Sequence, residues 1–289
     1  MQEERDIVLV LGSGGMMGVF TAGVMEVIDK RLRNRVHSVY ATSSGADVGV
    51  YFVSNQAQIP RRFFIEYLAS DTFLRKNWVA YMFKIFFTPQ SDRIPDFIDL
   101  DLVVRTARES DCSLDTQALT ASDISFFVKV IDVSQGRTHY LPAKENVFEK
   151  LRATSQCGPF TSTAVELDGK QYIDGDTIFS NIDAELAHRF SDKKIIYIEP
   201  AGGFYTQKIL LYPFYILAGL AIARLYGWRL GARYIHELFY DSSKYLCKFG
   251  NIVCIRNDRY VSSFCTNKKE LNDAFDYGVK LAEKTLQSV

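Results

Sequence analysis

Five short apolar runs recur along the chain, separated by stretches with helical spacing. The runs are Ile7–Leu11, Val36–Tyr40, Phe126–Ile131, Lys194–Ile198 and Asn251–Ile255. Strands that alternate with helices are typical of a mostly parallel sheet covered by helices on both faces. The pattern therefore predicts an α/β fold, a three-layer α/β/α sandwich with a mostly parallel central sheet.

Two further segments add detail to this prediction. The pair Asp168-Gly169 is a two-residue turn between β-prone arms, so it predicts a hairpin over Val165–Ile173. Near the end of the chain, Asn267 is followed three residues later by a glutamate, which is a helix-capping signal. This signal predicts a last helix over Lys268–Gln287.

The organisation of the chain is that of one unit. Its 289 residues contain no internal repeat, low-complexity tract or linker. We therefore expect a single domain over residues 1–289, with a core over about 6–200 and a C-terminal helical and strand extension over about 201–289. Hydrophobic residues make up 47% of the chain, which is enough for a buried core.

Charge and cysteine content limit the partners and the compartment. Lys and Arg number 34, and so do Asp and Glu, so no net field draws the chain to nucleic acid. The five cysteines form no C-x-x-C pair, and we expect free thiols in a reducing compartment. The first residues are charged and show no cleavable signal peptide. The expected location is the cytoplasm.

Two glycine-marked turns near the N-terminus carry the candidate chemistry. The loop Gly12–Gly18 follows the first apolar run, and Ala41–Gly45 follows the second. The second turn has the nucleophile-elbow pattern, with small residues two places before and two places after Ser43. Bulky residues there would keep strand and helix apart. Ser43 is therefore the candidate nucleophile; Ser44 fits less well, because Thr42 would then occupy a small-residue position.

In this order, the two turns resemble those of the patatin-like phospholipases, a family of lipid acyl hydrolases. The resemblance implies a lipid or phospholipid ester substrate, a Ser-Asp dyad, a glycine-rich oxyanion loop and no cofactor or metal. It covers nearly the whole chain. The matching segments are Gly14–Gly18, Ala22–Met25, Thr42–Gly45, Val130–Val133, Leu151–Ser155, Tyr172–Asp176 and Tyr277-Gly278.

The base that the resemblance implies is Asp174. The nearby Asp168 reads as a solvated hairpin tip, whereas Asp174 comes where a strand ends in a loop, the usual place for catalytic groups in such sheets. An ordinary aspartate has a pKa of about 3.9, so its use as a base implies a desolvated pocket. Asp176 stands where the family has glycine or alanine. A second carboxylate either raises the pKa of the base or obstructs the site.

The resemblance also implies the donors for the oxyanion. These are the backbone N–H groups of Gly14 and Gly15, together with that of Ser44 at the start of the helix after the elbow. The sequence departs from the family at two places. Met17 replaces the usual arginine or lysine, and Ala41 replaces the first elbow glycine.

Three other functions are compatible with parts of the pattern. Dinucleotide binding requires glycine at position 17, where the chain has Met17, and an acid after Val36–Tyr40, which is missing. A triad hydrolase would add His188 or His236 to the same serine and aspartate. A catalytically weak or inactive lipid-binding relative is the third alternative, because Met17 and Asp176 depart from the family pattern.

Two apolar stretches raise the question of membrane contact. Ile209–Ala223 is shorter than the roughly 20 residues that a spanning helix needs, and Trp78–Phe87 contains a lysine. We expect both to be buried helices of the core. The alternative is peripheral contact with a membrane surface, favoured by the mixture of aromatic and basic residues over Tyr212–Arg233. The oligomeric state stays open.

Overall fold

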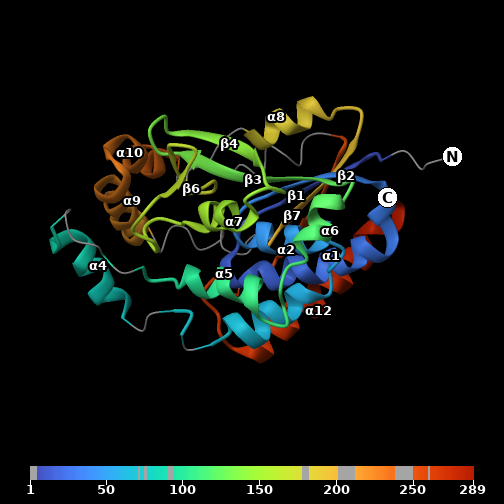
Figure 1. The fold of residues 1–289 in the computed structure, drawn as a ribbon, viewed down its shortest axis with the longest axis horizontal. Helices are drawn as coiled ribbons and strands as arrows, with labels where there is room; N and C mark the ends of the chain where they lie inside the picture. Colours follow the sequence, from blue (N-terminus) through green and yellow to red (C-terminus); the bar gives the residue numbers. More distant parts are fainter. Residues whose placement is uncertain are drawn as a thin grey trace.

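The computed structural model shows one sheet with helices packed on both faces (Figure 1). This arrangement confirms the predicted α/β/α fold. The single-domain organisation and its division at about residue 200 stay predictions. The structure describes residues 5–70, 72–74, 77–89, 94, 96–177, 182–200, 212–237, 250–259 and 261–289.

The sheet has eight strands, which are hydrogen-bonded in the sequence β5-β6-β3-β2-β1-β7-β8, and β4 also pairs with β3. All five predicted apolar runs are strands, and they form the continuous parallel part β3-β2-β1-β7-β8. The other three strands are antiparallel to their neighbours. The strands are β1 (Ile7–Leu11), β2 (Val36–Ala41), β3 (Ser125–Asp132), β4 (Arg137–Pro142), β5 (Val165–Leu167), β6 (Lys170–Asp174), β7 (Lys194–Glu199) and β8 (Ile252–Arg256).

Alternate residues of β1 serve the two faces of the sheet. Ile7, Leu9 and Leu11 belong to the larger apolar core, whereas Val8 and Val10 belong to a second cluster that includes residues of α8. This alternation follows from the two-residue period of a strand, and a central strand buried on both faces is therefore apolar throughout. In Figure 1, α8 covers one face, and α1, α2 and α12 cover the other.

The helices of the larger face include two that flank the glycine turns. α1 (Gly18–Leu32) follows the first turn, and α2 (Ser44–Val53) follows the second. A π-helical segment, η3, covers Phe63–Leu68. The remaining helices are α3 (Ile59–Arg62), α4 (Trp78–Phe87), α5 (Leu100–Glu109), α6 (Thr116–Ala121), α7 (Val147–Ser155), α8 (Ile182–Arg189), α9 (Tyr212–Tyr226), α10 (Trp228–Glu237) and α12 (Lys268–Thr285) with three short 3-10 turns, η1 (Gly15–Met17), η2 (Arg33–Arg35) and η5 (Leu286–Ser288).

Two local predictions are confirmed. The hairpin of β5 and β6 turns at Asp168 and Gly169, both with the positive φ angles (52° and 73°) that a tight two-residue hairpin turn requires. The last helix begins after Asn267, whose side chain accepts hydrogen bonds from the N–H groups of Lys269 and Glu270. Such a cap supplies partners that the first turn of a helix lacks.

The last helix crosses α1 at two glycines. A Cβ atom on Gly23 would lie 2.2 Å from the carbonyl oxygen of Phe275, and one on Gly278 would lie 2.4 Å from that of Phe20. Both distances are far below van der Waals contact. The crossing therefore depends on the absence of side chains at these two positions.

The two apolar stretches are only half buried, so the expectation of core helices is wrong for one face of each. Tyr81, Ile85 and Ala221 form an apolar cluster between α4 and α9. On the outer faces, four large apolar side chains are exposed, Phe83, Phe87, Leu217 and Leu220, and Trp228 at the start of α10 is exposed as well. The beginning of the second stretch, Ile209–Leu211, lies outside the described residues.

No helix in the described parts of the chain combines the length and apolar character needed to cross a membrane. Cys112, Cys157 and Cys265 are free thiols, as expected. Cys254 is disulfide-bonded, so the prediction of free thiols is wrong for this residue. An odd number of cysteines leaves room for a pair, and sequence spacing does not report which sulfur atoms approach in space.

Candidate active site

The candidate site lies where two strands meet along one edge of β3. β4 pairs along the other edge of β3, from Phe127 to Asp132. On the free edge, β2 runs parallel to β3 and ends opposite Val128, whereas β6 runs antiparallel and ends opposite Val130. The C-terminal ends of β2 and β6 therefore point toward each other, on either side of Lys129. This topology brings the residues after β2 and at the end of β6 together.

The first of these residues is Ser43, in a sharp turn between β2 and α2. Its backbone has φ 51° and ψ −129°, a combination that residues other than glycine rarely adopt. Its N–H donates to Thr154 Oγ1 at 3.1 Å, and the Thr154 hydroxyl donates to the carbonyl oxygen of Lys129 at 2.7 Å. The Thr154 side chain thus bridges Lys129, which lies between the ends of β2 and β6, and the backbone of Ser43. These two hydrogen bonds stabilise the strained turn.

Gly45, the glycine of the elbow, lies so close to the end of β1 that no side chain fits at this position. A Cβ atom on Gly45 would lie 2.6 Å from the carbonyl oxygen of Gly12 and 2.7 Å from that of Leu11. The first turn of α2 therefore passes directly against the end of β1. This contact brings the glycine loop and the serine turn together.

Asp174 is the last residue of β6 and is 1% exposed. Burial, followed by the charge of Asp176, raises the pKa of Asp174 to about 7. Hydrogen bonds from the Asp176 N–H, at 2.8 Å, and from the Ser43 hydroxyl act in the opposite direction, as does the charge of Lys129. Asp174 therefore lies in a desolvated environment in which burial outweighs the groups that lower its pKa.

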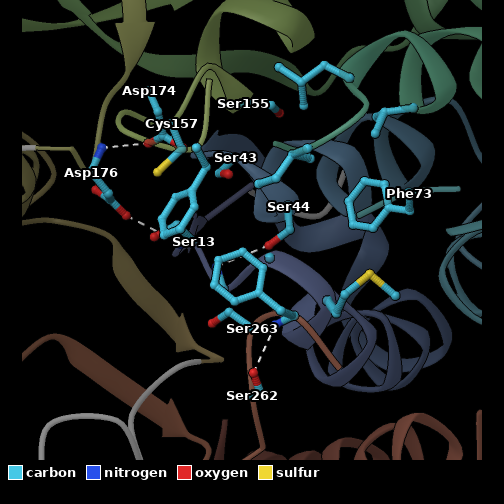
Figure 2. Close-up of a pocket in the computed structure, with 18 of the residues that line it drawn as sticks. Ser13, Ser43, Ser44, Phe73, Ser155, Cys157, Asp174, Asp176, Ser262 and Ser263 are labelled. Atoms are coloured by element: carbon cyan, nitrogen blue, oxygen red, sulfur yellow. Dashed lines mark hydrogen bonds between the residues drawn. The ribbon is translucent and has the colours of Figure 1, made fainter. Parts of the chain in front are cut away.

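Asp176 turns away from Ser43. One of its oxygens pairs with Lys129 Nζ at 2.8 Å, and the other accepts the N–H of Ser13 at 3.3 Å. The charge of Asp176 raises the pKa of Asp174, which is one of the two effects expected of this carboxylate. Figure 2 shows Ser43, Asp174 and Asp176 together on one side of the cavity and Phe73 on the opposite side.

The amides of the glycine loop differ in their hydrogen bonds. The Gly14 N–H donates to Ser44 Oγ at 3.1 Å, and the Met16 N–H donates to the carbonyl oxygen of Ser263 at 2.9 Å. The N–H groups of Gly15 and Ser44 donate to no other described residue. Gly15 has φ +56°, and a Cβ atom there would lie 2.5 Å from the Ser263 carbonyl oxygen.

A cavity of about 420 Å³ opens beside these groups, a volume within the range of ligand pockets. Its polar end holds the serine turn, the glycine loop and Asp174. The rest of the lining is mainly apolar and comes from η3, α5, α9 and the C-terminal segment near residue 264. These apolar residues include Phe64, Leu68, Phe73, Ile98, Leu100, Val103, Phe160, Phe214, Ala218 and Phe264.

The histidines of the alternative triad do not line the cavity. His188 and His236 are both exposed, and the described lining of the cavity contains no histidine. Within the described ranges, no group of three or more His, Cys, Asp or Glu side chains has the arrangement of a metal site.

Three parts of the site were missed from the sequence. Thr154 lies in the matching segment Leu151–Ser155, in the last turn of a helix, but it was given no role, and Lys129 lies within a strand without a motif. The segment Ser262–Phe264, which covers the glycine loop, has no pattern of its own. The one usable signal was a lysine in the middle of an apolar strand, because such a charge is rarely buried without a partner.

Comparison with known proteins gives three matches. The family model described as patatin-like phospholipase matches residues 9–188. The uncharacterized protein YjjU of Escherichia coli (strain K12) is 31% identical over 208 residues, which are 70% of this chain and 54% of YjjU. The chain thus spans about half the length of that relative. The crystal structure of VipD from Legionella pneumophila aligns with 97% of this chain and 67% of its own, with a TM-score of 0.47 and 11% identity.

Proposed function

Because the chain belongs to the patatin-like phospholipase family, we propose that it hydrolyses carboxylic esters of lipids with a Ser43–Asp174 dyad. One observation carries this proposal: Ser43 and the buried Asp174 come together where β2 and β6 end, and both line a mainly apolar cavity. A nucleophile within hydrogen-bonding reach of a base is the arrangement that acyl transfer needs.

In the first half of the reaction, Ser43 Oγ attacks the ester carbonyl carbon while Asp174 takes the hydroxyl proton. The tetrahedral intermediate collapses when the bond to the alcohol oxygen breaks, and Asp174 returns the proton to the departing alcohol. An acyl group then remains on Ser43. In the second half, Asp174 takes a proton from water, the resulting hydroxide attacks the acyl carbon, and the fatty acid leaves as Ser43 regains its proton.

The oxyanion donors that we propose are the N–H groups of Gly15 and Ser44, which have no other acceptor among the described residues. Ser44 adds the positive end of the α2 dipole. Gly14 joins them when the Ser44 hydroxyl rotates away, because that hydroxyl accepts the Gly14 N–H in the structure. Preorganised donors of this kind stabilise the charge that develops in the transition state.

The substrate class follows from the cavity. Its walls are mainly apolar and include Ser43 and Asp174, so a long acyl chain would lie along the walls with its ester at the dyad. Burial of each CH₂ group contributes about 0.8 kcal/mol, so such a cavity favours long chains over short ones.

The test combines labelling with hydrolysis. A fluorophosphonate should label the parent on Ser43 and fail to label Ser43→Ala. Ser43→Ala, Asp174→Asn and the double variant should each lose on the order of 1000-fold in kcat, because groups that act as a unit are not additive. Asp168→Asn is the matched control, since it makes the same chemical change in an exposed turn. Near-parental hydrolysis by Ser43→Ala would refute the dyad, whereas lipid binding without hydrolysis by the parent would favour the inactive lipid-binding alternative.

We further propose peripheral contact with a membrane through the exposed faces of α4 and α9 and the start of α10. Phe83 is 60% exposed, Phe87 76% and Trp228 69%. Arg229 is exposed beside Trp228, and residues 212–236 contain no acidic residue, which suits an anionic lipid surface. Other residues of α9 line the cavity, so this face lies beside the site. Such contact needs no spanning segment and fits the predicted cytoplasmic location.

Vesicle sedimentation tests this contact. Phe83→Ser with Phe87→Ser should weaken binding to vesicles that contain anionic lipid, and should reduce hydrolysis of vesicle lipid more than hydrolysis of a short soluble ester. Vesicles of neutral lipid serve as the control for the charge component. Unchanged sedimentation of the double variant on anionic vesicles would exclude this face.

A further inference from the structure

Asp176 contacts three elements that are far apart in the sequence, two through its carboxylate and one through its backbone N–H. It pairs with Lys129 of β3 at 2.8 Å and accepts the N–H of Ser13 in the glycine loop at 3.3 Å, while its own N–H donates to Asp174 at 2.8 Å. We propose that Asp176 and Lys129 are positioning residues that hold base, glycine loop and central strand as one frame and set the charge balance around the dyad. This inference rests on the proposed function of Ser43 and Asp174.

The position of Lys129 explains why the frame forms here. It stands opposite the gap between the ends of β2 and β6, and its side chain is 5% exposed. The chain after Asp174 passes directly over it: a Cβ atom on Gly175 would lie 2.5 Å from Lys129 Cγ and 2.7 Å from its carbonyl oxygen. A side chain at position 175 would therefore clash with Lys129, so this position requires glycine. The close approach also places the next residue, Asp176, beside the Lys129 ammonium group.

Burial gives the pair its importance. An ion pair on the surface contributes little, but an ammonium group this deeply buried needs a charged partner. Asp176 supplies that partner and at the same time holds the Ser13 N–H. Because Ser13 precedes the glycines, the same carboxylate fixes the distance between the base and the amides proposed for the oxyanion. Loss of either partner therefore disturbs two parts of the site together.

The pair also acts on Asp174 through charge. The groups that face Asp174 are Asp176 from its own loop, Lys129 from β3, the Ser43 hydroxyl and the Cys157 thiol. The charge of Asp176 raises the pKa of Asp174, and that of Lys129 lowers it. The two charges therefore oppose each other at the base. Removing the charge of Asp176 should therefore lower the pKa of Asp174, and removing the charge of Lys129 should raise it.

The experiment follows the acidic limb of the pH profile of kcat/KM on a short soluble ester. Asp176→Asn keeps an acceptor for Ser13 and loses the negative charge, so the limb should move about one pH unit lower. Lys129→Met loses the positive charge, so the limb should move about one pH unit higher. The double variant should return close to the parent. Arg108→Met with Glu149→Gln, which removes an exposed pair, is the control and should not move it.

Opposite shifts are the result that a purely structural pair would not give. Shifts in one direction, or no shift, in variants that fold and turn over ester would overturn the inference and leave the proposed function standing. If a single variant does not fold, the double variant decides, because it must fold and keep the parent's limb. If the parent neither hydrolyses ester nor reacts with fluorophosphonate, the proposed function fails. In that case, urea unfolding of the parent and the variants at a series of pH values reports the pKa of Asp174 without any activity. The inference still requires that Asp176→Asn lowers this pKa and that Lys129→Met raises it.

Discussion

Replacing Asp174 by asparagine should make the protein more stable while it abolishes hydrolysis. The carboxyl group is 1% exposed, and its pKa is raised from 3.8 to about 7, chiefly by burial. A folded state that raises the pKa of a carboxyl group favours its neutral form. The stability that this group contributes is therefore complete below about pH 4 and is lost as the pH rises through about 7.

The magnitude follows from the same two values. A rise from 3.8 to about 7 corresponds to about 4 kcal/mol of unfolding free energy lost between those pH values, taken as an upper limit. Asparagine carries no charge at any of these pH values, and its side-chain oxygen still accepts the Asp176 N–H. At about pH 8, Asp174→Asn should therefore exceed the parent by up to about 4 kcal/mol, and at about pH 4 the two should be nearly equal.

Urea unfolding at a series of pH values measures this difference. Asp47 is also buried and also has its pKa raised to about 7, but both proteins contain it, so its contribution cancels. Asp168→Asn should follow the parent curve at every pH, since that side chain lies in an exposed turn. A gap between Asp174→Asn and the parent that does not change with pH, or a less stable variant at pH 8, would refute the reasoning.

Three further predictions follow from close contacts and from the cavity. Gly15→Val should reduce kcat by about 100-fold or more, because its Cβ would lie 2.5 Å from the Ser263 carbonyl oxygen at a positive φ; unchanged kcat would remove the loop from the site. Gly278→Ala should lower the unfolding free energy by about 1–3 kcal/mol in urea titrations, because α1 and α12 must separate; an unchanged midpoint would contradict this. Ala218→Trp, in the cavity wall, should reduce kcat/KM for a long-chain ester more than for an acetate ester, and an equal loss on both would contradict the acyl-chain assignment.

Much of the fold could be predicted because its signals are local. The apolar runs became the parallel strands, and the turn at Asp168-Gly169 became the hairpin, since both depend on neighbours in the sequence. The approach of Ser43 to Asp174 came from family resemblance. Its physical cause is that β2 and β6 end opposite Val128 and Val130. These strands pair with β3 across 87 residues (Ala41 to Val128) and 44 residues (Val130 to Asp174), and such distant pairing leaves no local trace.

Other features of the site depend on contacts that no motif encodes. In the sequence, Lys129 is only a charged residue within a strand. Its ion pair with Asp176 becomes visible in the folded structure. The Gly14 N–H was assigned to the oxyanion from the family resemblance, whereas the Ser44 hydroxyl accepts it in the structure. The exposed faces of α4 and α9 were expected in the core, because apolar content alone does not say which side of a helix another element covers.

The position of β1 has a consequence for synthesis of the chain on the ribosome. β1 is apolar throughout and buried at every residue, yet one of its two partners, β7, is made about 190 residues later, which at 5–20 residues per second takes roughly 10–40 s. During that interval β2 can cover only one edge of β1. The other edge presents unpaired backbone groups beside apolar side chains, which is a template for aggregation. The yield of folded protein should therefore depend on how well a host's chaperones shield this strand.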